Sequence, residues 1–482
     1  MEVGLLIGDL DDAPAGRPTF ERRNPVSDNL VSVAVAATPA DALAAADAAQ
    51  AAFEGWSGLG PNARRAVLSK AADLMAERTD EFVDLMMAET GSTAGWAHFN
   101  LQATVALFRE AAAMTTQIGG EVIPSDRPGT FAMAVRQPAG VVLGIAPWNA
   151  PIILGARAIA MPLACGNTVV LKASEVCPAT HRLIGQVVRD AGAPAGAVNV
   201  INNAPGDAEA VVNALIAHPA VKRINFTGST HVGRLVARQA ALHLKPVLLE
   251  LGGKAPLIVL DDADLDEAVN ATIFGAYLNQ GQICMSTERV IVDEQVADAF
   301  VAKLAARARM ISTGDPAQGD VALGGLVDVR SARRVSDLIA DAVDKGAVLA
   351  AGGEAKGTIV AATVIDHVSP AMRIHSEESF GPVASIIRVQ GVEEAIRVAN
   401  DTEYGLSAAI YGRDVGRALA VAKRIRSGIC HINGPTVHDE PQMPFGGVGS
   451  SGYGRFGGKA AIAEFTDLRW ITITTGSLNY PF

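Results

Sequence analysis

Apolar residues recur at helical spacing in the first part of the chain. Residues 38–56 and 61–88 each show this pattern, and each range has a proline at its start, which suits a first helical turn. Each range predicts one helix. The pattern breaks at 121–137, which has turn residues in the middle and alternation at the end. This segment predicts a protruding β-hairpin.

Strands and helices alternate from Asn167 onward. Short apolar runs such as NTVVL, AVNVI and KRINF are each followed by an amphipathic segment, as far as PVLLELGG. A second alternating series begins at APLIVL and ends near residue 433, and the tract between Glu250 and Pro256 is the expected crossing point. The order predicts an α/β fold with parallel sheets wrapped by helices, as in nucleotide-binding domains. A β-rich end, RWITITTG, follows a short helical segment.

The composition excludes several kinds of protein. The chain has 482 residues, 49% of them hydrophobic, and a formal charge of −11 without a basic block, so a nucleic-acid partner is not expected. The most apolar stretch, 140–156, is interrupted by prolines and is shorter than the roughly 20 residues of a membrane span. No signal peptide is recognisable, and four scattered cysteines indicate neither a disulfide framework nor a metal site. A cytoplasmic protein without a membrane partner is expected.

Three tracts carry candidate chemistry. Cys284 lies beside glycine at the end of a helical segment, where it can be exposed and its thiolate stabilised by backbone N–H groups. Glu250 ends an apolar strand before two glycines, and a carboxyl group there should have a raised pKa, as a general base needs. Asn149 lies between two prolines and offers a fixed amide donor for an oxyanion. Each tract alone also fits a structural reading: a buried thiol, a paired glutamate or a turn.

A candidate phosphate site lies at KRINFTGSTHVG, where a strand runs through Gly228 and Ser229 into a helix whose N-terminus can receive a pyrophosphate. The chain has one GxGxxG pattern, which starts at Gly447. It follows a proline-rich loop and not a strand, so it does not predict a dinucleotide site.

Taken together, these tracts resemble the aldehyde dehydrogenase superfamily almost from end to end. Seven of its motifs occur in order over about 300 residues. They are PWN (147–149), KASE (172–175), FTGST (226–230), LELGGK (249–254), GQIC (281–284), EESFGPV (377–383) and PFGG (444–447). Further tracts, among them ERRNPVS, GQICMSTERVIVDE and HINGPTV, look like the salicylaldehyde and vanillin dehydrogenase group.

The resemblance implies a fold and a division of the chain. It implies an NAD-binding domain of residues 1–120 and 138–250, a catalytic domain of residues 251–455, and a β oligomerisation arm of residues 121–137 and 456–482. A homodimer or homotetramer is expected, because the strand edges of the arm need a partner.

The resemblance also implies roles for individual residues. Cys284 is the expected nucleophile, Glu250 the general base and Asn149 the oxyanion donor, with no metal. Glu175 is placed to accept bonds from the adenosine ribose and to repel a 2′-phosphate, so NAD is the expected cofactor. The residues expected to bind it are Ile145, Trp148, Lys172, Glu175, Gly228, Ser229, Val232, Leu251, Gly252, Glu378 and Phe380. The residues expected to line the substrate pocket are Trp96, Phe99, Arg157, Ile283 and Met285.

The predicted reaction is the oxidation of a hydroxylated benzaldehyde, such as salicylaldehyde or vanillin, to the acid through a cysteine thioester that water hydrolyses. A semialdehyde or aliphatic aldehyde dehydrogenase is the main alternative. A CoA-acylating enzyme is disfavoured by the presence of Glu250, and a non-catalytic binding protein by the presence of both Cys284 and Asn149. A cofactor-independent esterase is disfavoured by the KASE and FTGST tracts.

Overall fold

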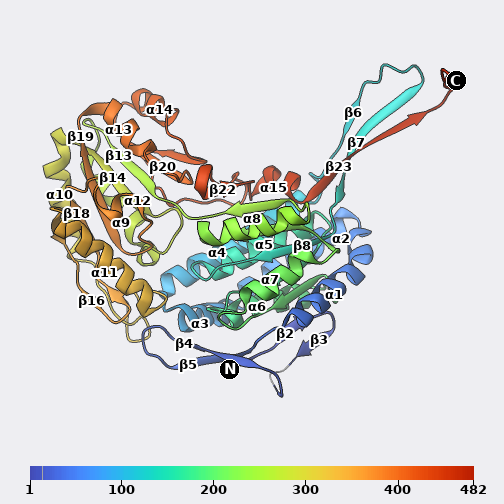
Figure 1. Ribbon diagram of the computed structural model, residues 1–482, viewed down its shortest axis with the longest axis horizontal. Helices are drawn as coiled ribbons and strands as arrows, with labels where there is room; N and C mark the ends of the chain where they lie inside the picture. The colour runs from blue at the N-terminus through green and yellow to red at the C-terminus, as the bar shows by residue number, and fades with distance from the viewer. Residues whose placement is uncertain (13–14) are drawn as a thin grey trace.

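The computed structural model describes residues 1–12 and 15–482. Figure 1 shows two α/β lobes joined side by side and a thin arm that projects away from both. No helix among the described residues is both long and apolar enough to cross a membrane.

The larger lobe is built on an eight-stranded sheet with the order β22-β12-β11-β8-β9-β10-β2-β3. The five strands from β12 to β10 run parallel, and β22, β2 and β3 add antiparallel edges. The strands are β2 (Leu5–Ile7), β3 (Leu10–Asp12), β8 (Val141–Ile145), β9 (Thr168–Lys172), β10 (Val198–Ile201), β11 (Val221–Thr227), β12 (Val247–Glu250) and β22 (Gly452–Tyr453).

Helices cover both faces of this sheet because its central strands are apolar on both sides. Leu143 of β8 packs in one core with α1 (Pro39–Ser57), α7 (Ala208–Ala217) and α8 (Thr230–Leu242). Its neighbour Val142 packs in the opposite core with α5 (Pro151–Ala164) and α6 (Pro178–Asp190). Outside α5 lie α2 (Pro61–Glu77), α3 (Thr79–Thr90) and α4 (Ala94–Met114).

The prediction of one helix over 61–88 is wrong, because the chain leaves helical geometry at Arg78 (φ −99°, ψ 28°). The Arg78 guanidinium pairs with Glu81 of the following helix and with Asp190 at the end of α6. These contacts anchor the break against a neighbouring helix. Periodicity along one segment carries no signal for such a contact.

The second lobe has a seven-stranded sheet with the order β15-β18-β19-β14-β13-β20-β21, parallel except for β15. Helices α9 (Leu265–Tyr277) and α10 (Glu294–Ala308) cover one face, and α11 (Val329–Asp344), α13 (Gly391–Asn400) and α14 (Val415–Ala422) cover the other. The strands are β13 (Ala255–Val259), β14 (Thr287–Asp293), β15 (Val348–Ala351), β18 (Thr363–Asp366), β19 (Val383–Val389), β20 (Ser407–Tyr411) and β21 (Ile429–Ile432). The short elements are β16 (Ala355–Lys356), β17 (Ile359–Val360) and α12 (Arg373–Ser376).

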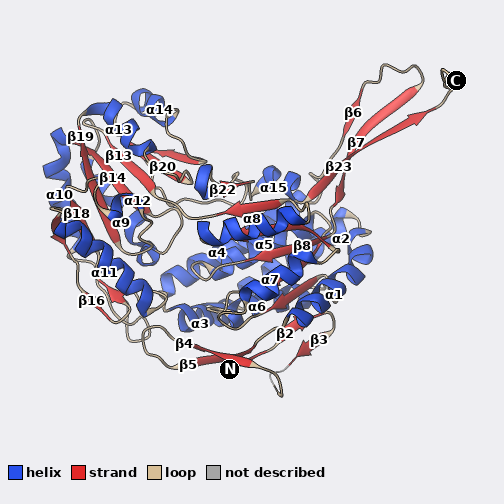
Figure 2. Cartoon of the chain, in the orientation of Figure 1, coloured by secondary structure: helices blue, strands red, loops and turns tan. Residues whose placement is uncertain are grey.

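The predicted hairpin forms the arm. Strands β6 (Glu121–Ile123) and β7 (Thr130–Pro138) pair antiparallel, and β23 (Thr466–Thr474) pairs with β7 along its whole length after the short helix α15 (Gly458–Glu464). Figure 2 shows the three strands of the arm standing clear of the lobes. A separate sheet of β1 (Glu2–Val3), β4 (Thr19–Arg23) and β5 (Leu30–Val35), which the sequence reading did not anticipate, lies on the larger lobe.

Candidate active site

The candidate site lies where the two lobes meet. Strand β12 of the first sheet ends at Glu250, and β13 of the second sheet begins at Ala255, so the tract between them crosses from one lobe to the other. A cavity of about 380 Å³ opens here. It is lined by Trp96, Phe99, Ala103, Asn149, Ala150, Ile153, Leu154, Arg157, Phe274, Ile283, Cys284, Met285, Pro435, Val437, His438, Asp439 and Phe445.

The loop that carries Cys284 follows α9 and is held in a strained shape. Asn279 and Gln280 both have left-handed backbones (φ 49° and 56°), followed by Gly281 at φ 70°. A side chain on Gly281 would strike the Gly381 carbonyl, so only glycine allows these two loops to approach each other. A left-handed backbone conformation at a non-glycine residue costs about 1 kcal/mol or more, and it persists only where surrounding contacts hold it.

Hydrogen bonds with three other residues hold both the backbone and the side chain of Asn149 in place. Its backbone carbonyl oxygen accepts hydrogen bonds from the Trp96 indole N–H (3.1 Å) and from the Asn279 side-chain amide (2.9 Å). Its own Nδ2 donates to the Gln282 carbonyl (2.9 Å), two residues before Cys284. Asn149 and Cys284 therefore line the same cavity in a set geometry, with one N–H of the amide used and the other able to donate.

Glu250 is wholly buried beside Cys284. No N–H or O–H group of the described residues bonds to either of its carboxyl oxygens. Burial raises the pKa of Glu250 to about 8, with Glu378 and Asp439 adding to the rise and Arg157 and the Cys284 thiol opposing it. The predicted rise in the pKa of this carboxyl group therefore has a desolvation cause.

The expectation of a stabilised thiolate at Cys284 is wrong for the cavity as it stands. The side chain is only partly buried, but desolvation raises the pKa of the thiol well above its usual value, and the nearby carboxylates of Glu250 and Glu378 raise it further. Burial and the neighbouring carboxylates thus favour the thiol over the thiolate at this position. The thiol must lose its proton before the sulfur can act as a nucleophile.

Arg157 lies in α5 with 7% of its surface exposed. Its guanidinium pairs with the Asp439 carboxylate and lies over the ring of Phe445, 4.4 Å from the centroid. A buried arginine is costly without an acidic partner, and this partner is 282 positions away along the chain, beyond the reach of local sequence patterns. Asp439 and Phe445 thus line the pocket in addition to the five residues predicted to do so.

The remaining predicted pocket residues all line the cavity. Trp96 and Phe99, on α4, stack with ring centroids 5.4 Å apart. Ile283 and Met285 flank the nucleophile candidate and are buried. Phe274, which the sequence reading did not select, adds a half-exposed ring from α9.

Several of the residues predicted to bind a cofactor lie at or just after the carboxyl ends of the parallel strands of the eight-stranded sheet. Ile145 ends β8, and Lys172 ends β9 with its ammonium 3.6 Å from the Glu175 carboxylate. Gly228 and Ser229 join β11 to α8, where the Ser229 hydroxyl caps the helix by accepting from the Val232 N–H. These ends form the edge at which open α/β sheets bind ligands.

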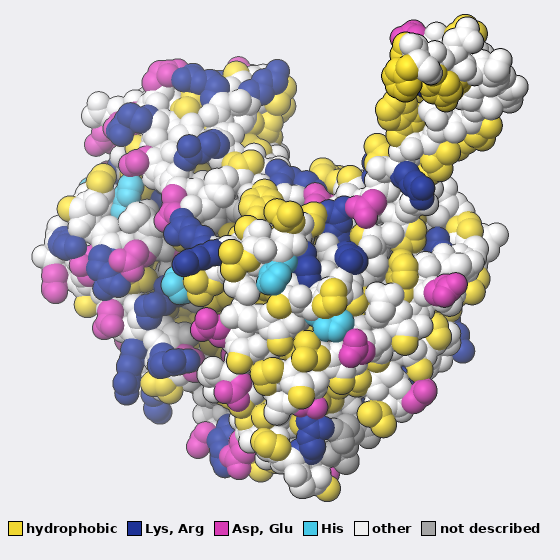
Figure 3. Space-filling model, turned by 45° about the vertical axis from the view of Figure 1, so that its right-hand side comes forward, with side chains coloured by type: hydrophobic (Ala, Val, Ile, Leu, Met, Phe, Trp, Pro, Cys, Tyr) yellow, Lys and Arg dark blue, Asp and Glu magenta, His cyan; other side chains and the backbone are white. Residues whose placement is uncertain are grey.

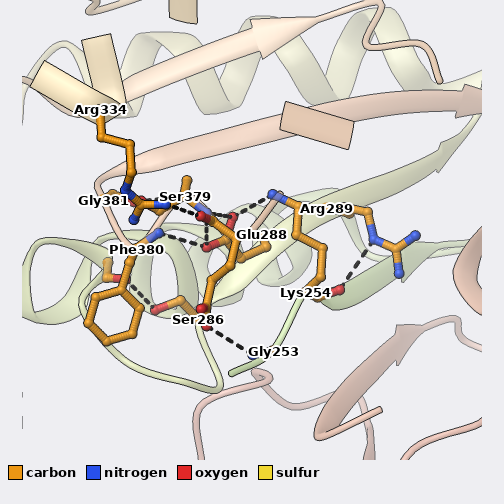
Figure 4. A network of polar contacts seen from close by, with 11 residues as sticks. Gly253, Lys254, Ser286, Glu288, Arg289, Arg334, Ser379, Phe380 and Gly381 are labelled. Atoms are coloured by element: carbon orange, nitrogen blue, oxygen red, sulfur yellow. Dashed lines mark hydrogen bonds and ion pairs between the residues drawn. The ribbon is translucent and has the colours of Figure 1, made fainter. Parts of the chain in front are cut away.

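A network of polar contacts, shown in Figure 4, holds the loop 377–381 against the site. The buried Glu288 carboxylate of β14 accepts from the N–H groups of Ser379 (2.9 Å) and Phe380 (3.1 Å) and from the Lys254 ammonium (2.7 Å). Arg334 donates to the carbonyl oxygens of Glu378 and Ser379, at 2.7 Å each.

These contacts fix Phe380 in a left-handed backbone (φ 48°), with its ring at the edge of Trp148, 5.7 Å between centroids. The Glu378 carboxylate accepts from the Gly253 N–H (2.9 Å) and fills the space that a side chain at Gly252 would occupy. Leu251 packs over Gly233 of α8. The structure thus brings Trp148, Glu378 and Phe380 together beside the crossing tract.

Known proteins match the whole chain. A family model for the aldehyde dehydrogenase family matches residues 13–471. A vanillin dehydrogenase of Pseudomonas fluorescens is 62% identical over 481 residues, and a salicylaldehyde dehydrogenase of Pseudomonas putida is 51% identical over 483 residues, each covering 100% of both chains. The crystal structure of a salicylaldehyde dehydrogenase from Pseudomonas putida, complexed with salicylaldehyde, has a TM-score of 0.98 at 50% identity over 99% of each chain.

Proposed function

The chain belongs to the aldehyde dehydrogenase family, and on that premise we propose that it oxidises hydroxylated benzaldehydes to their acids with NAD. The observation that carries the proposal is the cavity, in which Cys284 and Asn149 stand within walls made largely of aromatic and aliphatic side chains. The names of its vanillin and salicylaldehyde dehydrogenase relatives support the same substrate class.

Cys284 is the proposed nucleophile. Its thiol gives its proton to solvent in the cavity, and the sulfur adds to the aldehyde carbon. Asn149 Nδ2 and the Cys284 backbone N–H are the proposed donors to the oxygen, whose charge grows in this step. When bound, the nicotinamide supplies the hydride acceptor that turns the adduct into a thioester.

Glu250 is the proposed base for the second half of the reaction. Its carboxylate takes a proton from water, the resulting hydroxide adds to the thioester carbon, and the carboxylic acid leaves as the Cys284 sulfur is released. The buried position beside Cys284 and the raised pKa support this role, because a base whose pKa lies near the working pH can both accept and return a proton.

The site fits a nicotinamide dinucleotide on its own geometry. The N-terminus of α8, behind Gly228, suits a pyrophosphate, and the loop held by Glu288 presents Glu378 and Phe380 beside Trp148 for the nicotinamide end. In this proposal the cofactor residues are those at this edge of the eight-stranded sheet together with Glu378 and Phe380 of the other lobe. Glu175 repels a 2′-phosphate and so favours NAD over NADP. The eight-stranded lobe then holds the cofactor, and the other lobe carries the nucleophile.

A homodimer or homotetramer is part of the same proposal. The arm exposes a row of apolar side chains, among them Val122, Phe131, Trp470 and Ile473, and Figure 3 shows hydrophobic surface along it. Exposed apolar strands with open edges are stabilised by pairing with another chain. Four free cysteines also support a reducing compartment such as the cytoplasm.

The test is NAD(P)H formation with benzaldehyde, hydroxybenzaldehydes, vanillin, acetaldehyde and succinic semialdehyde, each with NAD and with NADP. A ring buries roughly 100 Å² more apolar area than acetaldehyde does, about 2.5 kcal/mol at about 25 cal/mol per Å², so aromatic aldehydes should lead in kcat/KM by more than tenfold. A preference for the short aldehydes refutes the aromatic assignment. Equal kcat/KM with NADP refutes the role of Glu175.

A further inference from the structure

The Arg157–Asp439 pair belongs to the wall of the substrate cavity and not to the outer surface. Both residues line the cavity that holds Cys284 and Asn149, and the Arg157 side chain is 8% exposed against 22% for Asp439. The guanidinium is held from a second side by Phe445 (4.4 Å) and Phe456 (5.7 Å). Cation–π contacts of this kind attract the guanidinium to the two rings independently of its pairing with Asp439.

The charges around Arg157 are mainly acidic. Asp439 pairs with it directly, Glu110 and Glu440 line a small adjoining cavity with it, and Glu250 is close enough for Arg157 to lower the pKa of that carboxyl group. The positive charge that the pocket offers is therefore already neutralised by Asp439 before a substrate enters.

We propose that Asp439 is a specificity-determining residue that, by occupying Arg157, excludes aldehydes bearing a carboxylate from the pocket. The inference rests on the proposed function and defines its substrate class as rings without a carboxylate. An anionic group entering this cavity would lose hydration and meet a carboxylate, with the nearby cation already paired. A ring without a carboxylate meets no such penalty and makes the same apolar contacts.

Benzaldehyde and 4-formylbenzoate are the matched probes, because they share the ring and the aldehyde and differ by one carboxylate. The Asp439→Asn variant keeps the size of the side chain and leaves Arg157 as an unpaired cation in the wall. The ratio of kcat/KM for 4-formylbenzoate to that for benzaldehyde should then rise at least tenfold, which equals about 1.4 kcal/mol.

Two further variants isolate the cause. Glu440→Gln removes a negative charge next along the chain, at a side chain that bonds to His438 and Gln442 and does not line the substrate cavity, so the ratio should stay within twofold of wild type. The double variant Arg157→Gln, Asp439→Asn also removes the cation. Its ratio of kcat/KM for 4-formylbenzoate to that for benzaldehyde should therefore return to the wild-type value.

The outcomes separate the two proposals. A wild-type enzyme without activity on any benzaldehyde overturns the proposed function, whatever the variants do. If the wild type is active and the Asp439→Asn variant turns over benzaldehyde with an unchanged ratio, only the role of Asp439 is overturned. If both Asp439→Asn and Asp439→Ser fail to fold, Asp439 is a structural residue and the inference is likewise overturned.

Discussion

The charge of Glu250 should control how fast the thioester is hydrolysed, and the structure sets the pH at which this happens. Its pKa is raised to about 8, chiefly because the carboxyl group is wholly buried. With a pKa near 8, about one-tenth of the groups are ionised at pH 7 and about nine-tenths at pH 9. The hydrolysis rate should therefore rise by roughly tenfold between these two pH values.

The Glu250→Gln variant tests the same point, because it removes the charge of the side chain and keeps its size. Hydrolysis should fall by about 10²-fold or more, the usual contribution of a general base, and should lose its rise with pH. Thioester formation should suffer less, because a thiol ionises far more readily than water and the cavity lets solvent take the Cys284 proton.

Stopped-flow recording of NADH with a hydroxybenzaldehyde measures both steps in one experiment. The variant should give a burst of about one NADH per active site and then a slow steady state, and intact-protein mass spectrometry should detect the acyl-enzyme. If hydride transfer is the step that slows most and no acyl-enzyme accumulates, the assignment of Glu250 as the base of hydrolysis is wrong.

Three other predictions follow from the site and the arm. Cys284→Ala should abolish aldehyde oxidation while leaving NAD affinity by calorimetry nearly unchanged, and retention of more than a small fraction of wild-type kcat would count against the nucleophile. Glu288→Gln should weaken the hold on the 377–381 loop and raise the KM for NAD about tenfold with a smaller effect on thioester hydrolysis. The control Asp366→Asn, which removes a buried carboxylate paired with Arg388 away from the loop, should lower Tm only. Light scattering at micromolar concentration should give a dimer or tetramer, and a monomer would contradict the proposed role of the arm.

Local sequence patterns were sufficient for the architecture of the two lobes. The alternation of apolar strands with amphipathic helices is a local signal: the parallel strands β9 to β12 lie where it predicted them, and the second series begins at β13 as expected. The ordered motifs likewise selected Asn149 and Cys284, which the structure places around one cavity. The first signal depends on the spacing of residues within a short segment, and the second on the order of seven short motifs along about 300 residues.

Contacts between distant segments could not be read in this way. The pairing of Arg157 with Asp439 joins helix α5 to a loop 282 residues later, and neither segment carries a mark of the other. The left-handed backbone of Phe380 runs against the preference of an aromatic residue and exists because Glu288 and Arg334 bind the loop around it. The raised pKa of the Cys284 thiol similarly follows from the burial of the finished site, which the nearby Gly281 does not signal.

The Arg157–Asp439 pair also connects substrate selection to the rate of hydrolysis. Asp439 raises the pKa of Glu250, and Arg157 lowers it. In the Asp439→Asn variant the first influence is gone and the second is no longer offset, so the pKa of Glu250 should fall. A larger fraction of the base is then ionised at pH 7, and the rise of hydrolysis with pH should move to lower pH. Pre-steady-state rates measured across pH 6–9 with benzaldehyde check this direction, and a shift to higher pH would show that Asp439 does not act on Glu250 through its charge. An acid that restricts the pocket to rings without a carboxylate would thus also keep the base of this enzyme more protonated near neutral pH.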